Sequence, residues 1–336
     1  MYHITKTLLL FSLITLCSLE ELDNSDKSWS RHFLKKIEEA KKLSKRRLAV
    51  AGAEEEVILR SCVEGYKLGL VDPILIGNEN KIKDIAKTNN LDISKFQIIH
   101  EPDRKHAAKL AVKLIYDKQA DMLMKGIVSA SDFITTVTNR KISETIRTGR
   151  SLSHVEVCEI EGIDQLLFMT DGAVHLYPTL ENKMHITYNA IEIAQALGIN
   201  IPKVAALSAT ELVNPSLQSA LDAYELVQMN EKASIRGCIV DGPLSLDMAI
   251  SKKAAEKKDC GRERKIRGDA DVLLFPSVES HSIAWQFLMH TSRHLAAHML
   301  VGAKVPIIMT GRADDIESYV HSMAIGSLLC EYFKEH

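Results

Sequence analysis

The sequence predicts an α/β protein made of two doubly wound, three-layer domains with mostly parallel sheets. At 336 residues, the chain is long enough for two domains of about 150 residues each. Short continuous apolar runs alternate with segments of helical spacing, which is typical of parallel strands covered by helices on both faces. Hydrophobic residues make up 46% of the chain and charged residues 26%, the usual proportions of a globular protein.

The first half of the chain alternates strands and helices from residue 30 onward. Apolar runs predict strands, and recurrence every three or four residues predicts helices. We expect strands at 48–52, 73–77, 96–100 and 121–126, with helices at 30–44, 54–68, around 82–86 and at 104–116. This half reads as one doubly wound domain.

The second half begins with a different pattern. Two strand-like segments, 155–160 and 165–169, flank Glu161-Gly162 and predict a hairpin. The alternation then resumes, with helices expected at 180–197, 217–229, 245–255, 283–299 and 316–332, and strands at 204–207, 238–240, 272–275 and 305–309.

Three histidines recur every four residues in the helix expected at 283–299. His290, His294 and His298 would therefore lie on one helical face, a spacing that could bind a transition metal. No companion carboxylate or cysteine motif marks the other ligands. We favour a solvated or interfacial polar face and expect no metal.

Residues 1–28 read as a leader outside the folded domains. Lys6 precedes an apolar run at 8–16, the layout of a short secretory signal. No A-x-A-like site follows, and Leu16 precedes Cys17, where a lipoprotein signal has a small residue. The run is also too short to span a bilayer as a helix. We favour a disordered or loosely helical leader and leave a cleaved signal open.

The composition argues against two classes of partner. A formal net charge of −2 and an aromatic share of 5% do not suit a nucleic-acid partner, which needs a basic face and often stacking side chains. No other long apolar run exists, so we expect no membrane partner. The six cysteines are scattered without a C-x-x-C pair, which favours a reducing, cytoplasmic location.

A basic, glycine-containing stretch lies at 146–154, between the two halves. Arginine forks and backbone N–H groups freed by glycine can hold phosphate or carboxylate oxygens. We expect an anion-binding cleft beside this crossing, while a solvated basic loop remains the alternative. The residues that carry this interpretation are Arg147, Thr148, Gly149, Arg150 and His154. His154 is equally compatible with a buried, hydrogen-bonded histidine.

Further polar residues stand where the predicted strands end. In open parallel sheets, ligands gather outside the carboxyl ends of the strands, and helix N-termini there favour negative charge. The sequence contains no Walker motif and no G-x-G-x-x-G after a strand, so neither a P-loop NTPase nor a dinucleotide-binding domain is supported. The strand ends supply Lys125, Gly126, Asp171, Thr310, Gly311 and Arg312, with Asp314 and Asp315 close behind.

Six segments, in this order, resemble the phosphate acetyl/butyryl transferase family, and the butyryl branch more closely than the acetyl branch. The likeness covers roughly residues 45–330, so it is more specific than any single motif. The segments are Leu123-Met-Lys-Gly126, Arg147-Thr-Gly-Arg150 with Leu152-Ser-His154, 167–171, 240–247, 301–304 and Thr310-Gly-Arg-Ala-Asp314.

The resemblance implies an architecture like that of isocitrate and isopropylmalate dehydrogenases, with the active site in a cleft between two domains. It places residues 29–147 and 300–336 in the first domain and 148–299 in the second. It also implies transfer of an acyl group between coenzyme A and inorganic phosphate, butyryl or a similar short or branched chain, by a homodimer or larger assembly. No cofactor is required beyond coenzyme A as substrate.

We assign hypothetical roles on this basis. Arg312 would hold the phosphate and its developing charge, and Asp314 or Asp315 would be the base. Because both aspartates precede the last helix, a structural N-cap is equally compatible. Thr310 or Ser129 would donate a hydroxyl to the intermediate. Further substrate or phosphate contacts are expected from Lys125, Gly126, Arg147, Thr148, Gly149, Arg150, His154, Asp171 and Gly311.

The sequence departs from the family pattern at several positions. Gly311 replaces a usual serine, and His175 replaces a usual asparagine. A usual Gly-Asn pair and a following Tyr-Lys are here His281-Ser282 and Trp285-Gln286. Phosphate acetyltransferase, a β-decarboxylating-type dehydrogenase, and a non-catalytic relative that binds coenzyme A or an acyl phosphate remain alternatives.

Overall fold

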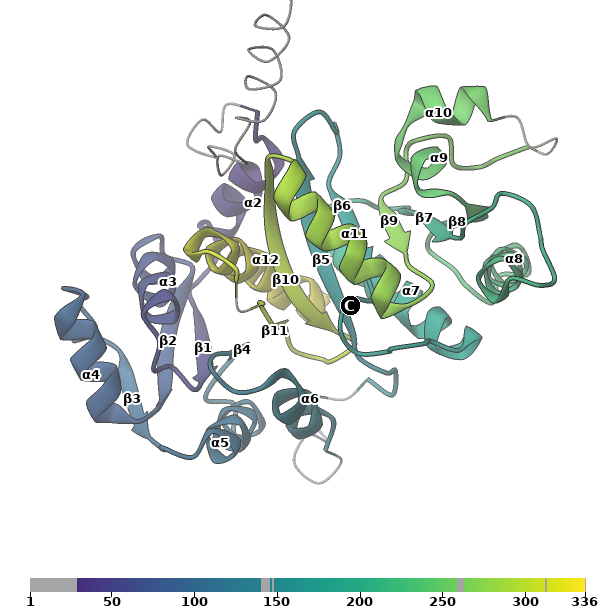
Figure 1. The fold of residues 1–336 in the computed structure, drawn as a ribbon. Helices are drawn as coiled ribbons and strands as arrows, with labels where there is room; N and C mark the ends of the chain where they lie inside the picture. The colour runs from purple at the N-terminus through teal and green to yellow at the C-terminus, as the bar shows by residue number, and fades with distance from the viewer. Residues whose placement is uncertain (1–28, 140–145, 147, 259–262, 312, 336) are drawn as a thin grey trace, which may run out of the picture.

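Eleven strands of the described chain form one continuous sheet (Figure 1). The computed structural model describes residues 29–139, 146, 148–258, 263–311 and 313–335; the predicted leader, Arg147 and Arg312 lie outside them. The strand order is β3-β2-β1-β4-β11-β10-β5-β6-β9-β7-β8. The predicted α/β class with a mostly parallel sheet is confirmed, but the two halves share one sheet.

The first half of the sheet is parallel and doubly wound, as predicted. Helices α4, α5 and α6 each begin shortly after a strand, and Asn78, Asp103 and Ser129 cap them by accepting a first-turn backbone N–H. These caps fix the sharp turns at the strand ends. The elements are α2 (His32–Ala40), β1 (Arg46–Ala51), α3 (Glu56–Lys67), β2 (Val71–Gly77), α4 (Glu79–Thr88), β3 (Gln97–His100), α5 (Arg104–Tyr116), β4 (Met122–Lys125) and α6 (Ala130–Thr138).

The second half of the sheet is also parallel but runs in the opposite direction. Three antiparallel pairings, β11 with β10, β10 with β5 and β5 with β6, reverse the strand direction between the halves. The β5–β6 pair confirms the predicted hairpin. The elements are β5 (Ser153–Ile160), β6 (Leu167–Thr170), α7 (Leu180–Ala196), β7 (Lys203–Leu207), α8 (Gln218–Glu231), β8 (Ile239–Leu244), α9 (Leu246–Ile250), α10 (Lys252–Lys257), β9 (Val272–Leu274), α11 (Val278–Thr291), β10 (His294–Val301), β11 (Ile307–Ile308) and α12 (Ile316–Glu335).

The helix predicted over residues 283–299 is correct up to Thr291 and wrong beyond it. α11 ends at Thr291, and β10 then pairs with β5 along its whole length. Because β10 is buried on both faces, its sequence lacks the alternation of apolar and polar residues that marks a half-buried strand. It also contains Leu, Ala and Met, which favour helices. His290, on α11, therefore does not share a helical face with His294 and His298, which lie on β10. The boundary predicted at residue 300 falls inside this strand.

Helices cover both faces of the sheet and give three layers. On one face, a single apolar core runs beneath α2, α3, α4, α7, α8 and α12. On the other face the core is divided into two parts, one beneath α5 and α6 and one beneath α9 and α11. Figure 1 shows α11 lying along β10 and β5. Among the described residues, no helix is long and apolar enough to cross a membrane.

Candidate active site

A cavity of about 650 Å³ opens at the carboxyl ends of β4 and β11. Lys125, the last residue of β4, and Gly126 line it on one side, and Thr310 and Gly311, which follow β11, line it on the other. Since β11 pairs parallel with β4, these two strand ends lie side by side. The structure thus brings four of the predicted site residues together.

Gly126 allows the backbone to pass close to the neighbouring strand end. Its N–H donates to Ala51 O at 2.9 Å, and a Cβ at this position would lie 1.9 Å from Gly52 O. No side chain fits there without moving the backbone. Glycine is therefore required to bring the chain from β4 along the cavity wall.

Cationic and polar groups line the cavity beside Gly126. The side chain of Lys125 is buried, and its Nζ donates to Gly126 O at 3.1 Å. The first residues of α6 also line the cavity, so their N–H groups and the helix dipole favour an anion. Arg104 adds a guanidinium, while Glu55 and Asp132 add carboxylates.

Ser129 caps α6. Its Oγ accepts from Asp132 N at 3.1 Å and donates to Asp132 Oδ2 at 2.9 Å. These contacts make Thr310 the better hydroxyl donor to a ligand. The buried Oγ1 of Thr310 interacts with the Tyr319 side chain, which also lines the cavity, but it makes no hydrogen bond of standard geometry with a described residue.

The turn after β11 separates the roles of two aspartates. Asp315 Oδ1 accepts from Ser318 N and Ser318 Oγ, both at 2.8 Å, and so caps α12. The Asp314 side chain is buried; its Oδ2 accepts from Gly311 N at 2.6 Å and lies 3.2 Å from His298 Nε2. The geometry favours the structural interpretation for Asp315 and leaves Asp314 as the candidate base.

A buried cluster of histidines around Glu156 lies behind this turn. Glu156 Oε1 is 3.0 Å from His154 Nδ1, and Glu156 Oε2 is 2.9 Å from His281 Nε2. The His298 ring stacks on the His154 ring with centroids 5.9 Å apart. We call His154, Glu156, His281 and His298 the histidine cluster. It lies between the two separate cores of that face of the sheet.

The charges of the histidine cluster are strongly coupled. Burial alone would lower the pKa of His154, but the Glu156 carboxylate reverses this effect and raises that pKa to about 9. Burial alone would raise the pKa of Glu156, but His154 and His281 hold it well below its usual range. Burial lowers the pKa of His298. An ionised glutamate is thus held among imidazoles.

Asp171 fixes the loop that follows β6. Its carboxylate accepts from the backbone N–H groups of residues 154, 173, 174 and 175 at 2.9–3.1 Å and lies 2.7 Å from His175 Nδ1. Burial alone would raise the pKa of Asp171, but His175 and these N–H groups lower it. These contacts show that the carboxylate orients the loop after β6.

The described part of the 146–154 crossing contacts other elements. Thr148 Oγ1 donates to Gly302 O at 2.6 Å, and Gly149 has a φ of 91°. Arg150 forms a two-contact pair with Glu192 of α7, at 2.8 and 2.9 Å. None of these three residues lines the cavity described above. Arg147 and Arg312, the other predicted anion holders, are not among the described residues.

Sequence reasoning missed Glu156 altogether and noted His281 only as a departure. A signal was present for the first: residues 154 and 156 flank Val155, where the predicted strand begins, and residues two apart in a strand share one face. His154 and Glu156 are thus a polar pair on one face of an otherwise apolar strand. The cluster's second strand, β10, was missed because its residues up to 299 were predicted to be helical.

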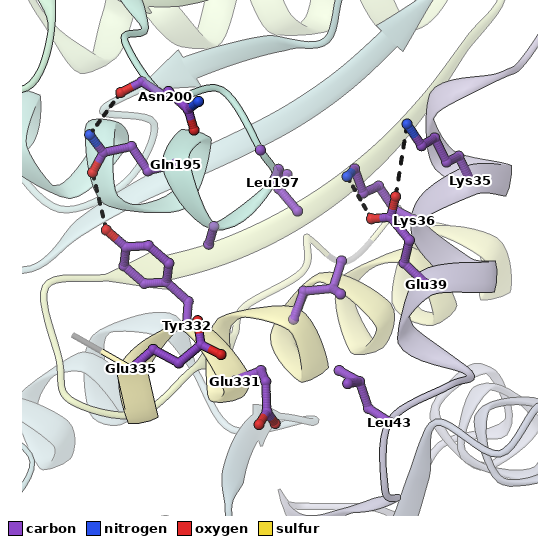
Figure 2. A pocket seen from close by; sticks show the side chains of 13 residues that line it. Lys35, Lys36, Glu39, Leu43, Gln195, Leu197, Asn200, Glu331, Tyr332 and Glu335 are labelled. Atoms are coloured by element: carbon purple, nitrogen blue, oxygen red, sulfur yellow. Dashed lines mark hydrogen bonds and ion pairs between the residues drawn. The ribbon is translucent and has the colours of Figure 1, made fainter.

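A second cavity, of about 830 Å³, lies between α2, α7 and α12 (Figure 2). Its polar side chains largely bind one another: Tyr332 donates to Gln195 at 3.1 Å, and Lys36 donates to Glu39 at 2.6 Å. It holds none of the predicted site residues. The first cavity is therefore the candidate active site.

A sequence model of the family described as "Phosphate acetyl/butaryl transferase" matches residues 32–110 and 101–327. The chain belongs to this family. The resemblance inferred from its motifs is confirmed, and so is the assignment to the phosphate acyltransferases.

Individual relatives agree with the family assignment. The chain is 39% identical over 293 residues to the phosphate butyryltransferase of Clostridium acetobutylicum, covering 87% of this chain and 96% of that one. It is 32% identical over 296 residues to the phosphate acetyltransferase of Thermotoga maritima, covering 88% and 99%. A solved branched-chain phosphotransacylase from Enterococcus faecalis superposes with a TM-score of 0.73 at 28% identity, covering 85% and 99%.

Several positions at which this chain departs from the family's motif pattern lie near the histidine cluster. His281 contacts Glu156, the Trp285 ring packs edge-on against His298 at 5.4 Å, and His175 pairs with Asp171. Gly311 departs differently: a Cβ there would lie 3.4 Å from Asp314 Oδ1, an ordinary contact. A serine would therefore fit at position 311, so the absence of its hydroxyl is not explained by lack of space.

Proposed function

We propose that this chain transfers a butyryl or similar short or branched acyl group from coenzyme A to inorganic phosphate, releasing coenzyme A and an acyl phosphate. The observation that carries the proposal is the cavity at the ends of β4 and β11, where Lys125 and the N-terminus of α6 meet, in a chain that belongs to this family. The likeness to a phosphate butyryltransferase and to a branched-chain phosphotransacylase supports the acyl class.

Phosphate would bind between Lys125 and α6. The ammonium group and the first-turn N–H groups suit its negative oxygens, and partial burial strengthens both interactions. Arg312 would complete this anion site, as its position in the Thr310-Gly-Arg-Ala-Asp314 motif implies. A phosphate oxygen would attack the thioester carbonyl, and the carbon–sulfur bond would then break.

Thr310 and Asp314 would act on the second substrate, the acyl-CoA thioester. The Thr310 hydroxyl would donate to the oxyanion of the tetrahedral intermediate, since its hydroxyl lies in the lining between the two strand ends. The leaving thiolate takes up a proton to give the thiol; in the reverse reaction, Asp314 would accept that proton. A thiol pKa of about 8.5 makes such a base useful near neutral pH.

A thiol-release assay tests this proposal. The full chain is given acetyl-, propionyl-, butyryl- or isobutyryl-CoA, each with and without phosphate. We expect phosphate-dependent release of coenzyme A, higher with the four-carbon substrates, and its loss in Arg312→Ala. Preference for acetyl-CoA would favour a phosphate acetyltransferase. Coenzyme A binding without turnover on any substrate would contradict the enzyme proposal.

We further propose the two-domain architecture of isocitrate-dehydrogenase-like proteins, with residues 29–147 and 300–336 in one domain and 148–299 in the other. The division of the core on one face of the sheet, and the pairing of β11 with β4, support it. We propose a cytoplasmic homodimer or larger assembly. Exposed Ile283 and Phe287, four residues apart on α11, support assembly, which light scattering in solution measures.

A further inference from the structure

The histidine cluster contains four buried polar atoms that make no hydrogen bond of standard geometry with a described residue. His154 Nδ1, Glu156 Oε2, His281 Nε2 and His298 Nε2 all lack a partner of standard geometry among the described residues. Three nitrogen–oxygen pairs lie at ion-pair distance, His154–Glu156 at 3.0 Å, His281–Glu156 at 2.9 Å and His298–Asp314 at 3.2 Å, but none has the angles of a hydrogen bond. Buried polar atoms in this state need another partner.

Three members of the cluster form a set of metal ligands. His154, Glu156 and His298 are all buried, and each offers one ligand atom within 4.8 Å of the other two. Two imidazoles and one carboxylate are a common ligand set for Zn²⁺ and related divalent ions. Two neighbouring strands in the middle of the sheet, β5 and β10, carry all three.

The contacts around these ligands also fit a metal ion. His154 Nε2 lies 2.8 Å from Met309 O, a carbonyl that can only accept, so Nε2 carries a proton. In a neutral ring the lone pair then belongs to Nδ1, on the side of Glu156. Metal-binding histidines are usually oriented in this way by the other ring nitrogen.

We propose that the histidine cluster binds one divalent transition-metal ion of the Zn²⁺ type through His154 Nδ1, Glu156 and His298 Nε2. His281 and Asp314 lie at its edge, within 2.9 Å of Glu156 and 3.2 Å of His298. The two carboxylates would balance the charge of a dication in this buried place. The proposal departs from the absence of a metal expected from the sequence.

The ion would fix the turn after β11, which contains Gly311 and Asp314, against the sheet. Asp314 contacts His298 and also receives the Gly311 N–H, so a metal on His298 would fix the turn that borders the cavity. Without a metal, a proton on His154 would hold the cluster together instead. The two states differ in a quantity that can be measured directly, the uptake of metal.

Metal titration of the full, untagged chain tests the proposal. The protein is stripped with a chelator, and Zn²⁺ is titrated against a chromophoric competitor; Co²⁺ is added separately to record its visible d–d absorption. We expect one ion per chain and the bands of four- or five-coordinate Co²⁺. Glu156→Gln and His298→Gln should each weaken binding by about 100-fold or more.

His294→Gln is the matched control. His294 lies on the same strand, four residues before His298, and is not among the three ligands. It should bind metal like the unaltered chain, and circular dichroism should show that all variants are folded. The proposal would be overturned if the unaltered chain failed to bind Zn²⁺ stoichiometrically at micromolar concentration. It would also be overturned if Glu156→Gln and His298→Gln bound Zn²⁺ as tightly as the unaltered chain. Neither result depends on acyl transfer.

Discussion

The two faces of β5 and β10 differ sharply, although both are buried. On one face, Val155 and Val157 continue into a single apolar core with alternate residues of β10. On the opposite face, His154, Glu156 and His298 interrupt the apolar packing between two separate cores. Burying these polar groups is costly, and apolar residues on both faces would give a more stable sheet. The polar face is therefore where a function is expected.

Two glutamates on β5 show the same contrast in detail. Glu159 Oε1 accepts from Arg31 N and His32 N, and its Oε2 accepts from Ser30 Oγ and Phe33 N, at 2.6–3.0 Å. All four donors lie at the start of α2, so Glu159 ties that helix to the sheet. Glu156 has only histidine nitrogens beside it, without hydrogen-bond geometry. One carboxylate ties a helix to the sheet, and the other is paired only with imidazoles.

The largest effect on stability is expected on the apolar face. Met299 is fully buried in the continuous core, so Met299→Ala should lower the free energy of unfolding by about 2–5 kcal/mol. Denaturant titration measures this free energy. Leu34→Ala, at an exposed position, is the control, and its free energy of unfolding should change by less than about 0.5 kcal/mol. A loss in Met299→Ala no larger than the control's would mean that this face is not the stabilising one.

Glu159→Gln should have a smaller, pH-dependent effect. Burial alone would raise the pKa of Glu159, but the hydrogen bonds from the start of α2 lower it below its usual value. The ionised Glu159 carboxylate therefore stabilises the folded chain fully above the unfolded-state pKa of about 4.3. This stabilisation is lost as the pH falls through the folded-state pKa. We expect a loss of about 1–2 kcal/mol at pH 7.

The pH series provides the control for that prediction. The difference between Glu159→Gln and the unaltered chain, measured by denaturant titration, should shrink as the pH falls below about 4. A difference that stays constant down to the acid transition would show that the carboxylate charge is not what holds α2.

The smallest effect is expected at Gly311. Gly311→Ser should fold normally, with a stability change within about 0.5 kcal/mol, because a Cβ there makes only an ordinary contact with Asp314. The added hydroxyl should raise kcat by up to about 10-fold, equivalent to about 1.4 kcal/mol, if it donates to the developing charge. An unchanged or lower kcat would show that the cavity does not use a hydroxyl at this position.

The sequence predicted most of the fold because apolar strands and capped helices leave local patterns. The strand ends at Lys125 and Thr310 could be placed together from topology alone, since parallel strands share an edge. β10 could not be found, because a strand buried on both faces loses its alternation. The histidine cluster could not be assembled either, since it needs the register of β5 against β10, which brings His298 opposite Glu156.

The most direct test of the proposed active site is the phosphate dependence of Lys125→Met. If phosphate binds between Lys125 and α6, its KM should rise by about 10-fold or more, while the KM for acyl-CoA changes little. Arg150→Met is the matched control, because Arg150 is held by Glu192 outside this cavity, and its phosphate KM should stay close to that of the unaltered chain. A phosphate KM unchanged in Lys125→Met but raised in Arg150→Met would contradict the proposed site and return the anion site to the 146–154 crossing.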